Sequence, residues 1–279
     1  MNCTNCSAKL RAGTFKCPKC KKWNFQTKNA LEGRKDVQIL SEVEDNEVDH
    51  ISTGAWDPCF GIHFRTKKAG PVKGSVYLLG GVPGAGKSTL SLQLADALGG
   101  SLQQNVMYIA AEEELKPIKE RGLRLQLQHM NKILGISAVG GIQTELGRLL
   151  LEYKPAGIVL DSLPGLSLDT AAAGVEYCQA LKGYAVALKC PIIVIDHATK
   201  QDDLAGLMAL QHGVDGTLVM FVNEDETRTL TNIKCRHGPS GIEIHMAMTE
   251  FGLRKIESSD SDSDTEEDDE EEDNRRGAS

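Results

Sequence analysis

The octapeptide GVPGAGKS at residues 81–88 constrains the fold of this 279-residue chain more than any other stretch. It matches the pattern G-x-x-x-x-G-K-[ST] and lies between GSVYLLGG, a run typical of a buried strand, and the amphipathic, helix-like stretch KSTLSLQLADALGG. Backbone N–H groups in such a loop, together with the positive end of the helix, favour binding of a phosphate chain. The sequence therefore predicts a nucleotide-binding α/β protein whose first long helix ends at Gly99-Gly100.

The same motif predicts roles for individual residues in binding ATP with Mg²⁺. Lys87 is expected to reach the β- and γ-phosphates, and Ser88 is expected to hold Mg²⁺. Asp161, which ends the predicted strand GIVLD, is expected to orient this ion through its water shell, with a cap of the following turn as the alternative. The expected nucleotide contacts are Gly81, Val82, Pro83, Gly84, Ala85, Gly86, Lys87, Ser88, Thr89 and Asp161.

Two further strand ends carry side chains suited to hydrolysis. In AAEEE (110–114), one glutamate can polarise the attacking water, while the others fit the first turn of the following helix. The residues alone do not choose among Glu112, Glu113 and Glu114. In IDHATK (195–200), His197 is expected near the γ-phosphate, where it would respond to loss of that group; a packed core histidine is the alternative.

The order of strand-like and helix-like stretches predicts the fold class. From residue 74 onward strands alternate with helices, which indicates a parallel sheet covered on both faces. From residue 217 the strands TLVMFV, RTLTNIKC and IEIHMAM come one after another, which predicts an antiparallel extension at one edge. No apolar run reaches the ~18 residues of a membrane span, and the N-terminus lacks the apolar stretch of a signal peptide. We therefore expect a soluble, cytoplasmic protein with no membrane partner.

A pair of cations closes the strand RTLTNIKC. Lys234 and Arg236 lie two residues apart, so on a strand both point to the same face, and Gly238-Pro239 then ends the strand. Like charges side by side require an anion or a solvated rim. The residues alone leave open an anionic ligand, phosphate contacts to DNA, and a solvated edge that discourages addition of another strand.

Two C-x-x-C pairs, CTNC and CPKC, form a second strong motif near the N-terminus. Four thiolates from two such turns can converge tetrahedrally on one Zn²⁺, whereas a redox motif comes as a single pair beside a βαβ unit. A module this small cannot bury a core, so the metal would supply its folding free energy. Residues 1–28 hold seven Lys/Arg and no acid, which favours nucleic-acid binding, with solubility as the alternative. The expected zinc ligands are Cys3, Cys6, Cys17 and Cys20.

Charge divides the rest of the chain into blocks. Residues 29–52 hold seven acids against two bases and are typical of a linker. Residues 257–279 hold twelve acids and two arginines, a net charge of −10, so that residues 1–256 carry +2 of the total of −8. The expected organisation is a zinc ribbon (1–28), an acidic linker (29–52), a nucleotide-binding core (53–256) and a disordered acidic tail (257–279).

Taken in order, these motifs resemble those of one family, the bacterial RadA (Sms) recombination ATPases of the RecA/DnaB-like group. The four-cysteine module, HISTGAWD (50–57), the phosphate loop and VMYIAAEEE (106–114) are each similar to a family motif. The more specific matches are DHATKQDDLAGLMALQHGVD (196–215) and KCRHGPSGIEIHMAMTEFGLRKI (234–256), which is similar to the family's K-N-R-F-G segment and the residues after it. The resemblance covers roughly residues 1–256.

The resemblance implies a RecA-like ATPase core behind a zinc ribbon. It further implies a DNA-dependent ATPase that forms a homo-hexameric ring, moves on single-stranded DNA and extends recombination intermediates, with a recombinase as a candidate partner. It selects Glu112 as the water-polarising glutamate, and it makes Lys234 and Arg236 the paired cations that enter the neighbouring subunit's site. The alternatives are a replicative helicase or helicase loader, which shares the nucleotide-site motifs, and an ATP-regulated DNA-binding scaffold with little turnover.

The chain departs from the family pattern in three places. Cys235 and His237 replace the Asn and Phe of the K-N-R-F-G segment, and Asp196 replaces a glycine beside His197; these changes could weaken DNA-coupled function and leave ATP binding intact. Residue 256 is followed by the acidic tail, so we expect the family's Lon-like C-terminal domain to be missing. We therefore expect no protease activity.

Overall fold

The computed structural model describes residues 2–3, 6–9, 17–21, 48–139, 143–164, 171–196 and 210–257. They fall into two compact units, Met1–Glu47 and Val48–Ser279, and each unit is considered by itself. His197, most of the predicted linker (29–47) and nearly all of the predicted acidic tail (258–279) lie outside the described residues. Within the described part of the chain, no helix is long and apolar enough to cross a membrane.

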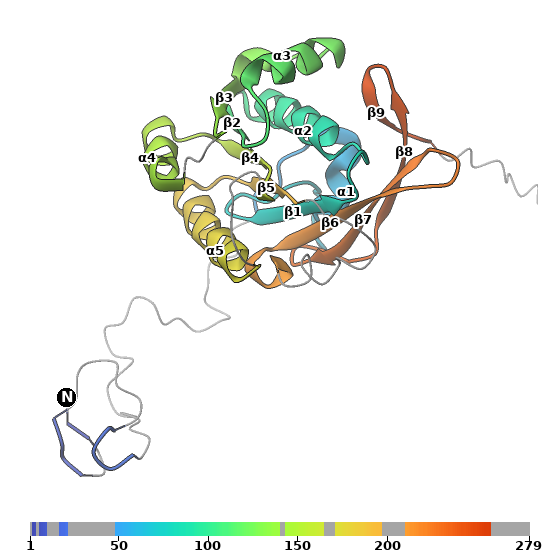
Figure 1. Ribbon diagram of the computed structural model, residues 1–279. Helices are drawn as coiled ribbons and strands as arrows, with labels where there is room; N and C mark the ends of the chain where they lie inside the picture. Colours follow the sequence, from blue (N-terminus) through green and yellow to red (C-terminus); the bar gives the residue numbers. More distant parts are fainter. Residues whose placement is uncertain are drawn as a thin grey trace, which may run out of the picture. The chain divides into compact units, whose positions relative to one another are not determined.

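A sheet forms the centre of the larger unit, and its described strands lie in the order β3-β2-β4-β5-β1-β6-β7-β8-β9 (Figure 1). The strands from β3 to β6 in this order run parallel, and β7, β8 and β9 continue the sheet antiparallel. The parallel strands therefore have all their carboxyl ends at one edge of the sheet. The strands are β1 (Val76–Gly81), β2 (Val106–Ala110), β3 (Ile133–Ser137), β4 (Gly157–Asp161), β5 (Ile192–Ile195), β6 (Gly216–Val222), β7 (Arg228–Cys235), β8 (Glu243–Thr249) and β9 (Gly252–Lys255).

Helices cover both faces of the parallel strands because alternate residues of a strand point to opposite sides. In β1, Tyr77 and Leu79 enter the core shared with α2 and α3, whereas Val76 and Leu78 enter the core shared with α4 and α5. Burying each such side chain contributes about 1.5–3 kcal/mol. The helices are α1 (Asp57–Phe60), α2 (Lys87–Leu102), α3 (Leu115–Arg124), α4 (Gln143–Tyr153) and α5 (Ala171–Leu188), with short 3-10 turns η2 (Gly54–Trp56), η3 (Met130–Lys132) and η6 (Gln211–Gly213).

The predicted α/β class, with a parallel sheet and an antiparallel extension, is confirmed. The extension begins one strand later than expected, because β6 is parallel to β1 and only β7 reverses direction. Every residue of β1, β2, β4 and β5 is buried, which is the continuous apolar pattern that a strand covered on both faces requires.

One predicted boundary is wrong. α2 does not end at Gly99-Gly100 but continues to Leu102, and Gln103 closes it with a left-handed backbone conformation (φ 52°). A glycine inside a helix costs only about 1 kcal/mol relative to alanine, which packing can offset. A Cβ on Gly100 would lie 2.5 Å from the ring of His129, so the missing side chain allows the segment before η3 to pack directly on α2.

Candidate nucleotide and metal sites

The loop from Gly81 to Lys87 connects the carboxyl end of β1 to the first turn of α2. Gly81 and Gly86 have φ values of 142° and 104°, a region that favours glycine. Close packing also excludes a larger residue, since a Cβ on Gly81 would lie 2.5 Å from the carbonyl oxygen of Met220. The loop thus ends at the N-terminus of a 16-residue helix, where the helix dipole stabilises an anion.

Lys87 is the buried cation of this loop, with 3% of its surface exposed. Its Nζ donates to the carbonyl oxygens of Gly81 (2.7 Å) and Val82 (3.0 Å). Burial lowers the pKa of Lys87, and nearby carboxylates, Asp161 foremost, oppose this shift. Carbonyl oxygens and carboxylates together hold the ammonium group inside the phosphate loop.

Ser88 and Asp161, the predicted Mg²⁺ ligands, lie side by side. Ser88 Oγ donates to Asp161 Oδ1 (3.3 Å), and the hydroxyl of Tyr108 donates to Asp161 Oδ2 (2.6 Å). Asp161 is 6% exposed, and burial raises the pKa of its carboxyl group above the ordinary value despite these two hydrogen bonds. Hydroxyl and carboxylate oxygens are ligands that Mg²⁺ accepts, so this pair fits the ion beside Lys87.

Two of the three glutamates after β2 have partners away from the phosphate loop. Glu113 forms a two-bond ion pair with Arg121 of α3, with N–O distances of 2.6 and 3.1 Å. Glu114 is the N-cap residue of α3, and its carboxylate accepts a hydrogen bond from Ser137 Oγ (3.2 Å). Both side chains are therefore held by α3 and the edge strand β3.

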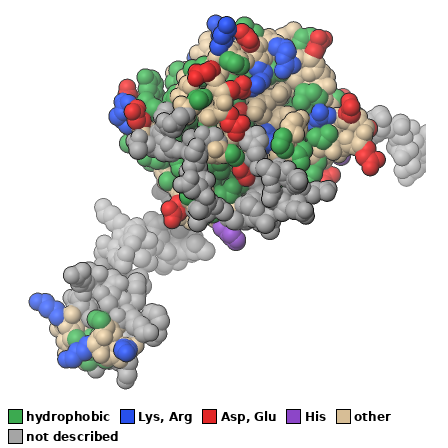
Figure 2. Space-filling model, in the orientation of Figure 1, with side chains coloured by type: hydrophobic (Ala, Val, Ile, Leu, Met, Phe, Trp, Pro, Cys, Tyr) green, Lys and Arg blue, Asp and Glu red, His purple; other side chains and the backbone are tan. Residues whose placement is uncertain are grey.

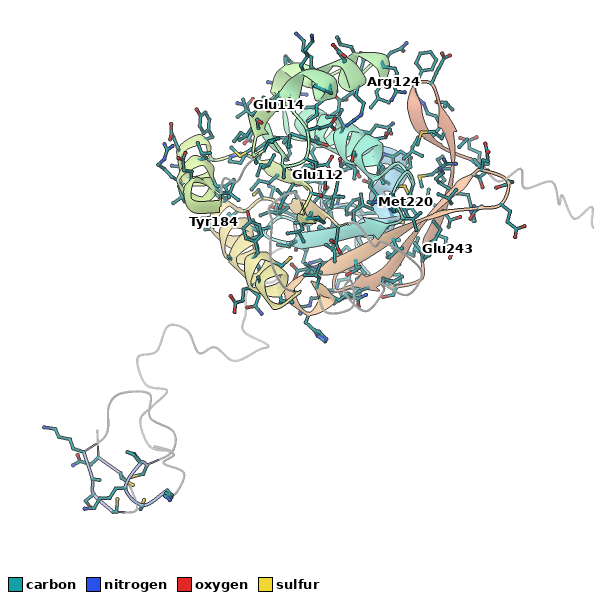
Figure 3. The ribbon with its side chains drawn as sticks, viewed as in Figure 1. Glu112, Glu114, Arg124, Tyr184, Met220 and Glu243 are labelled. Carbon is teal, nitrogen blue, oxygen red and sulfur yellow. The ribbon has the colours of Figure 1, made fainter. Side chains whose placement is uncertain are left out.

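Glu112 has different surroundings. Its carboxylate accepts a hydrogen bond from Ser162, the residue next to Asp161, and its charge acts on both Lys87 and Asp161. The side chain lies among the ends of the central strands, whereas Glu114 lies at the start of α3 (Figure 3). Of the three glutamates, Glu112 is the one that hydrogen-bonds beside the predicted Mg²⁺ ligand.

A cavity of about 400 Å³ lies beside the phosphate loop. Its walls come from the loop and the first turn of α2, from Arg121 and Arg124 of α3, and from Met248 and Thr249 at the end of β8. Arg124 lies at the end of α3 nearer β9 (Figure 3), and basic and acidic side chains are mixed on the surface over α3 (Figure 2). We did not predict these four wall residues from the sequence, because no motif spacing connects them to the loop; the only available signal is the pair of arginines on the helix that comes after the glutamates.

The predicted cation pair lies at the opposite edge of the parallel strands. Arg236 forms an ion pair with Asp215 (3.2 Å), the residue immediately before β6, and Lys234 Nζ donates to the carbonyl oxygens of Gln211 and Val214 (2.9 Å for the latter). Since β6 is parallel to β1, Asp215 lies at the amino edge of these strands, and the phosphate loop lies at the carboxyl edge. The structure does not bring Lys234 and Arg236 together with Lys87 and Glu112 within one chain.

The smaller unit brings the four N-terminal cysteines together. Their Sγ atoms all lie within 4.8 Å of one another, and the pairs Cys3–Cys20 and Cys6–Cys17 have Sγ–Sγ distances of 3.7 Å. A tetrahedral ion with Zn–S bonds of about 2.3 Å separates its sulfur ligands by about 3.8 Å, so the cluster fits zinc. These thiols could hold a zinc ion.

The two C-x-x-C stretches form matching turns. The backbone N–H of Ser7 donates to the carbonyl oxygen of Cys3 (2.9 Å), and that of Lys21 donates to the carbonyl oxygen of Cys17 (2.8 Å). Ser7 and Lys21 both have positive φ values, 55° and 58°, so each turn reverses the chain after its second cysteine. The same local geometry, used twice, presents two sulfur atoms from each side of the cluster.

The sheet order and the phosphate loop define a class, the α/β nucleotide-binding proteins with a RecA-like core. A KaiC-like protein from Pyrococcus horikoshii OT3 matches this fold with a TM-score of 0.60, over 76% of this chain and 100% of its own, at 15% sequence identity. Identity this low establishes likeness of fold alone. No protein-family model matches the chain.

Within that class, the chain resembles the bacterial proteins named DNA repair protein RadA, as its motifs predicted. The identity is 31% over 92% of this chain for the Haemophilus influenzae protein, 31% over 91% for that of Bacillus subtilis, and 29% over 92% for that of Escherichia coli. The chain spans 59%, 58% and 59% of the lengths of these three relatives.

Proposed function

We propose that this chain is a DNA-dependent ATPase of DNA repair and homologous recombination. The observation that carries the proposal is the site at the carboxyl edge of the sheet, where buried Lys87, the Ser88–Asp161 pair and Glu112 surround one phosphate loop. ATP with Mg²⁺ is the ligand whose charge and size such a loop fits. The similarity to relatives named DNA repair protein RadA connects the site with DNA.

Each side chain at the site has a separate task in hydrolysis. Lys87 neutralises negative charge on the β- and γ-phosphates, and Ser88 and Asp161 hold Mg²⁺, which supplies further positive charge when bound. Glu112 positions the attacking water and accepts its proton, a contribution typically of about 10²–10⁴-fold in rate. His197 keeps its proposed place near the γ-phosphate, although it lies outside the described residues.

The contacts of the neighbouring glutamates support Glu112 as the base. Both carboxylate oxygens of Glu113 accept hydrogen bonds from Arg121, which directs this side chain toward α3. Glu114 is the N-cap residue of α3, and its carboxylate accepts a hydrogen bond from Ser137 of β3. The cavity walls formed by Arg121 and Arg124 extend from the phosphate loop, and we propose that they receive the base and ribose of the nucleotide.

We further propose that Lys234 and Arg236 act on the nucleotide of a neighbouring copy in a homo-hexameric ring. Arg236 lies at the level of Val76, because the backbone of Asp215 bonds to both residues (2.9 and 2.8 Å). From Val76 to Gly81 is five residues, about 16 Å at 3.3 Å per strand residue, which exceeds the length of an arginine side chain. An arginine supplied in trans can raise the rate of phosphoryl transfer roughly 10³–10⁵-fold.

The proposed work of the ATPase is translocation on single-stranded DNA and branch migration of recombination intermediates, with a recombinase as a candidate partner. A replicative helicase or helicase loader would use the same nucleotide site. An ATP-regulated DNA-binding scaffold would bind ATP with little turnover. We also propose that the four clustered cysteines hold one zinc ion and form a basic DNA-binding module.

The deciding experiment measures ATP turnover with and without single-stranded DNA, for the wild-type chain and for Lys87→Ala. We expect DNA to raise kcat and Lys87→Ala to abolish hydrolysis. ATP binding without DNA-stimulated turnover would instead support the scaffold. Unwinding of a forked duplex, without extension of a three-stranded joint, would support the replicative helicase.

A further inference from the structure

A buried carboxylate lies directly behind Arg236. The side chain of Asp215 is 4% exposed, and its backbone N–H donates to the carbonyl oxygen of Val76 (2.8 Å) while its carbonyl oxygen accepts from the N–H of Arg236 (2.9 Å). Asp215 Oδ2 accepts from Lys182 Nζ (2.6 Å) and from the N–H of Val76 (2.9 Å), and Oδ1 accepts from Arg236 Nη1 (3.2 Å). The carboxylate is therefore fixed in place, and one of its two oxygens holds the arginine.

The surroundings keep this carboxylate charged. Burial alone would raise the pKa of Asp215, but the hydrogen bonds from Lys182 and from the N–H of Val76 outweigh it, and the pKa is lowered below the ordinary value. Lys182, Lys234 and Arg236 contribute three positive charges against the one negative charge of Asp215, a net charge of +2. The cluster as a whole therefore stays cationic.

Arg236 is held at one end but keeps donors for a second partner. Its ion pair with Asp215 uses Nη1, and the side chain remains 57% exposed. A guanidinium has five N–H donors in a rigid fork, so a single bond to Asp215 fixes its direction and leaves other donors accessible. Lys234, in contrast, directs its ammonium group to backbone carbonyl oxygens of the segment before β6.

We propose that Asp215 is a positioning residue that aims Arg236 at the nucleotide of the neighbouring copy, and that Lys182 shares its charge so that Arg236 is oriented without being neutralised. The inference rests on the proposed trans role of Arg236. Fixing a long side chain before the reaction removes the cost of ordering it in the transition state. A purely structural Asp215, which ties the start of β1 to α5 and serves only its own chain, is the competing explanation.

The first test is Asp215→Asn in the full chain, which keeps the shape of the side chain and removes its charge. We expect kcat for DNA-stimulated ATP hydrolysis to fall about 10- to 100-fold, the usual effect of a misplaced catalytic group, with the KM for ATP unchanged. Asp225→Asn is the matched control, because Asp225 lies in the exposed turn between β6 and β7 and bonds to Thr227. The control should have wild-type kcat.

A mixing experiment separates the positioning role from a structural one. Asp215→Asn chains keep the phosphate loop and Glu112, and Glu112→Gln chains keep Asp215 and Arg236, so a junction between the two variants contains one complete site. We expect ATPase activity to recover on mixing, as it should when Arg236→Ala chains are mixed with Glu112→Gln chains. Recovery with Arg236→Ala but not with Asp215→Asn, in mixtures shown to co-assemble, would overturn the proposal and leave Asp215 a structural residue.

The remaining outcomes are also decisive. If neither mixture recovers although both co-assemble, the trans role of Arg236 is wrong, and the positioning role falls with it. If Asp215→Asn chains no longer bind ATP, the same measurements are made with Lys182→Met, which keeps the carboxylate of Asp215. We expect Lys182→Met to lower kcat, and we expect ATPase activity to recover when these chains are mixed with Glu112→Gln chains. Lys182→Arg, which keeps the positive charge, should have a kcat near that of the wild-type chain. Wild-type kcat in Lys182→Met would overturn the shared-charge arrangement.

Discussion

Glu112, the proposed base, and Glu113 are adjacent in the chain, yet their carboxylates have different hydrogen-bond partners. A general base must direct a carboxylate oxygen toward the attacking water. Both oxygens of Glu113 instead accept hydrogen bonds from the guanidinium of Arg121, a two-bond arrangement that fixes the direction of the side chain. Glu112 accepts a hydrogen bond from the hydroxyl of Ser162 and adjoins the Ser88–Asp161 pair.

We therefore predict different results for two isosteric substitutions. Glu112→Gln should bind ATP and hydrolyse it roughly 10²–10⁴-fold more slowly, because the positioned base is lost. Glu113→Gln should retain hydrolysis and lose up to about 1 kcal/mol of stability, the usual contribution of a partly exposed ion pair. ATP binding and single-turnover hydrolysis measure the difference. A dead Glu113→Gln beside an active Glu112→Gln would mean that the base is the next residue along the chain.

Whether a residue of the candidate site could be predicted from the sequence depended on how close in the chain it lies to the other residues of that site. Lys87 and Ser88 belong to one continuous motif (81–88), whose spacing alone predicts a phosphate site. Arg124 and Thr249 reach the same cavity from α3 and β8, and only the fold brings those elements together. The partners of Asp215 could not be predicted for the same reason, since they come from α5, from β1 and from the residue that follows β7.

At the scale of elements, continuous apolar runs gave the parallel strands correctly, because burial on both faces leaves little choice of residue. Glycine did not predict the end of a helix. The pair Gly99-Gly100 was expected to end α2, but Gly100 lies inside the helix, where the ring of His129 leaves no room for a side chain. Asp96 of α2 fixes that segment by accepting from the N–H groups of Gln128 (3.2 Å) and His129 (2.6 Å).

This packing predicts the sign of a stability change. Gly100→Ala should destabilise the wild-type chain despite the better helix propensity of alanine, because the Cβ would lie 2.5 Å from the ring of His129. In a His129→Ala background the same change should stabilise the chain by up to about 1 kcal/mol. Gly183→Ala in α5, where a Cβ would meet nothing within 4 Å, should stabilise both backgrounds. Denaturant unfolding measures each value, and an equal effect of Gly100→Ala in the two backgrounds would contradict the explanation.

The matching cysteine turns lead to a second prediction at this scale. The wild-type chain should bind one zinc ion, and Cys17→Ser should reduce the bound metal and unfold the first 28 residues locally, because the hydrophobic cluster among the described residues of that module consists of the four cysteines and Ala8. Cys235→Ser is the matched control, since Cys235 lies at the end of β7 outside the cluster. Elemental analysis and proteolysis of the N-terminal segment report the two effects. A chain purified without chelator that contains no zinc would refute the assignment.

Over the whole molecule, charge is distributed very unevenly along the chain. Residues 1–256 carry a net +2, and the 23 residues from 257 to 279 carry −10. Residue 256 is still tied to the sheet, since the N–H of Ile256 donates to the carbonyl oxygen of His245 (2.8 Å), so this anionic segment begins at the antiparallel extension. An anionic chain tethered at that point competes with DNA for any cationic surface within its reach.

The resulting prediction concerns salt. Deleting residues 257–279 should tighten binding to single-stranded DNA at low salt, because it removes twelve acidic residues that would compete with the DNA for cationic side chains. The gain should shrink as salt rises, since ions screen the tail and DNA alike. A tail of the same length with its twelve acids replaced by Asn and Gln is the matched control, because it keeps the tether and removes the charge. In titrations with single-stranded DNA at several salt concentrations, we expect this variant to bind with the affinity of the deletion variant.

Two outcomes would contradict the prediction. If the variant with the neutral tail binds DNA like the wild-type chain while the deletion variant binds more tightly, the bulk of the tail rather than its charge weakens binding. Equal affinity of all three proteins at low salt would leave the tail without a role in DNA binding.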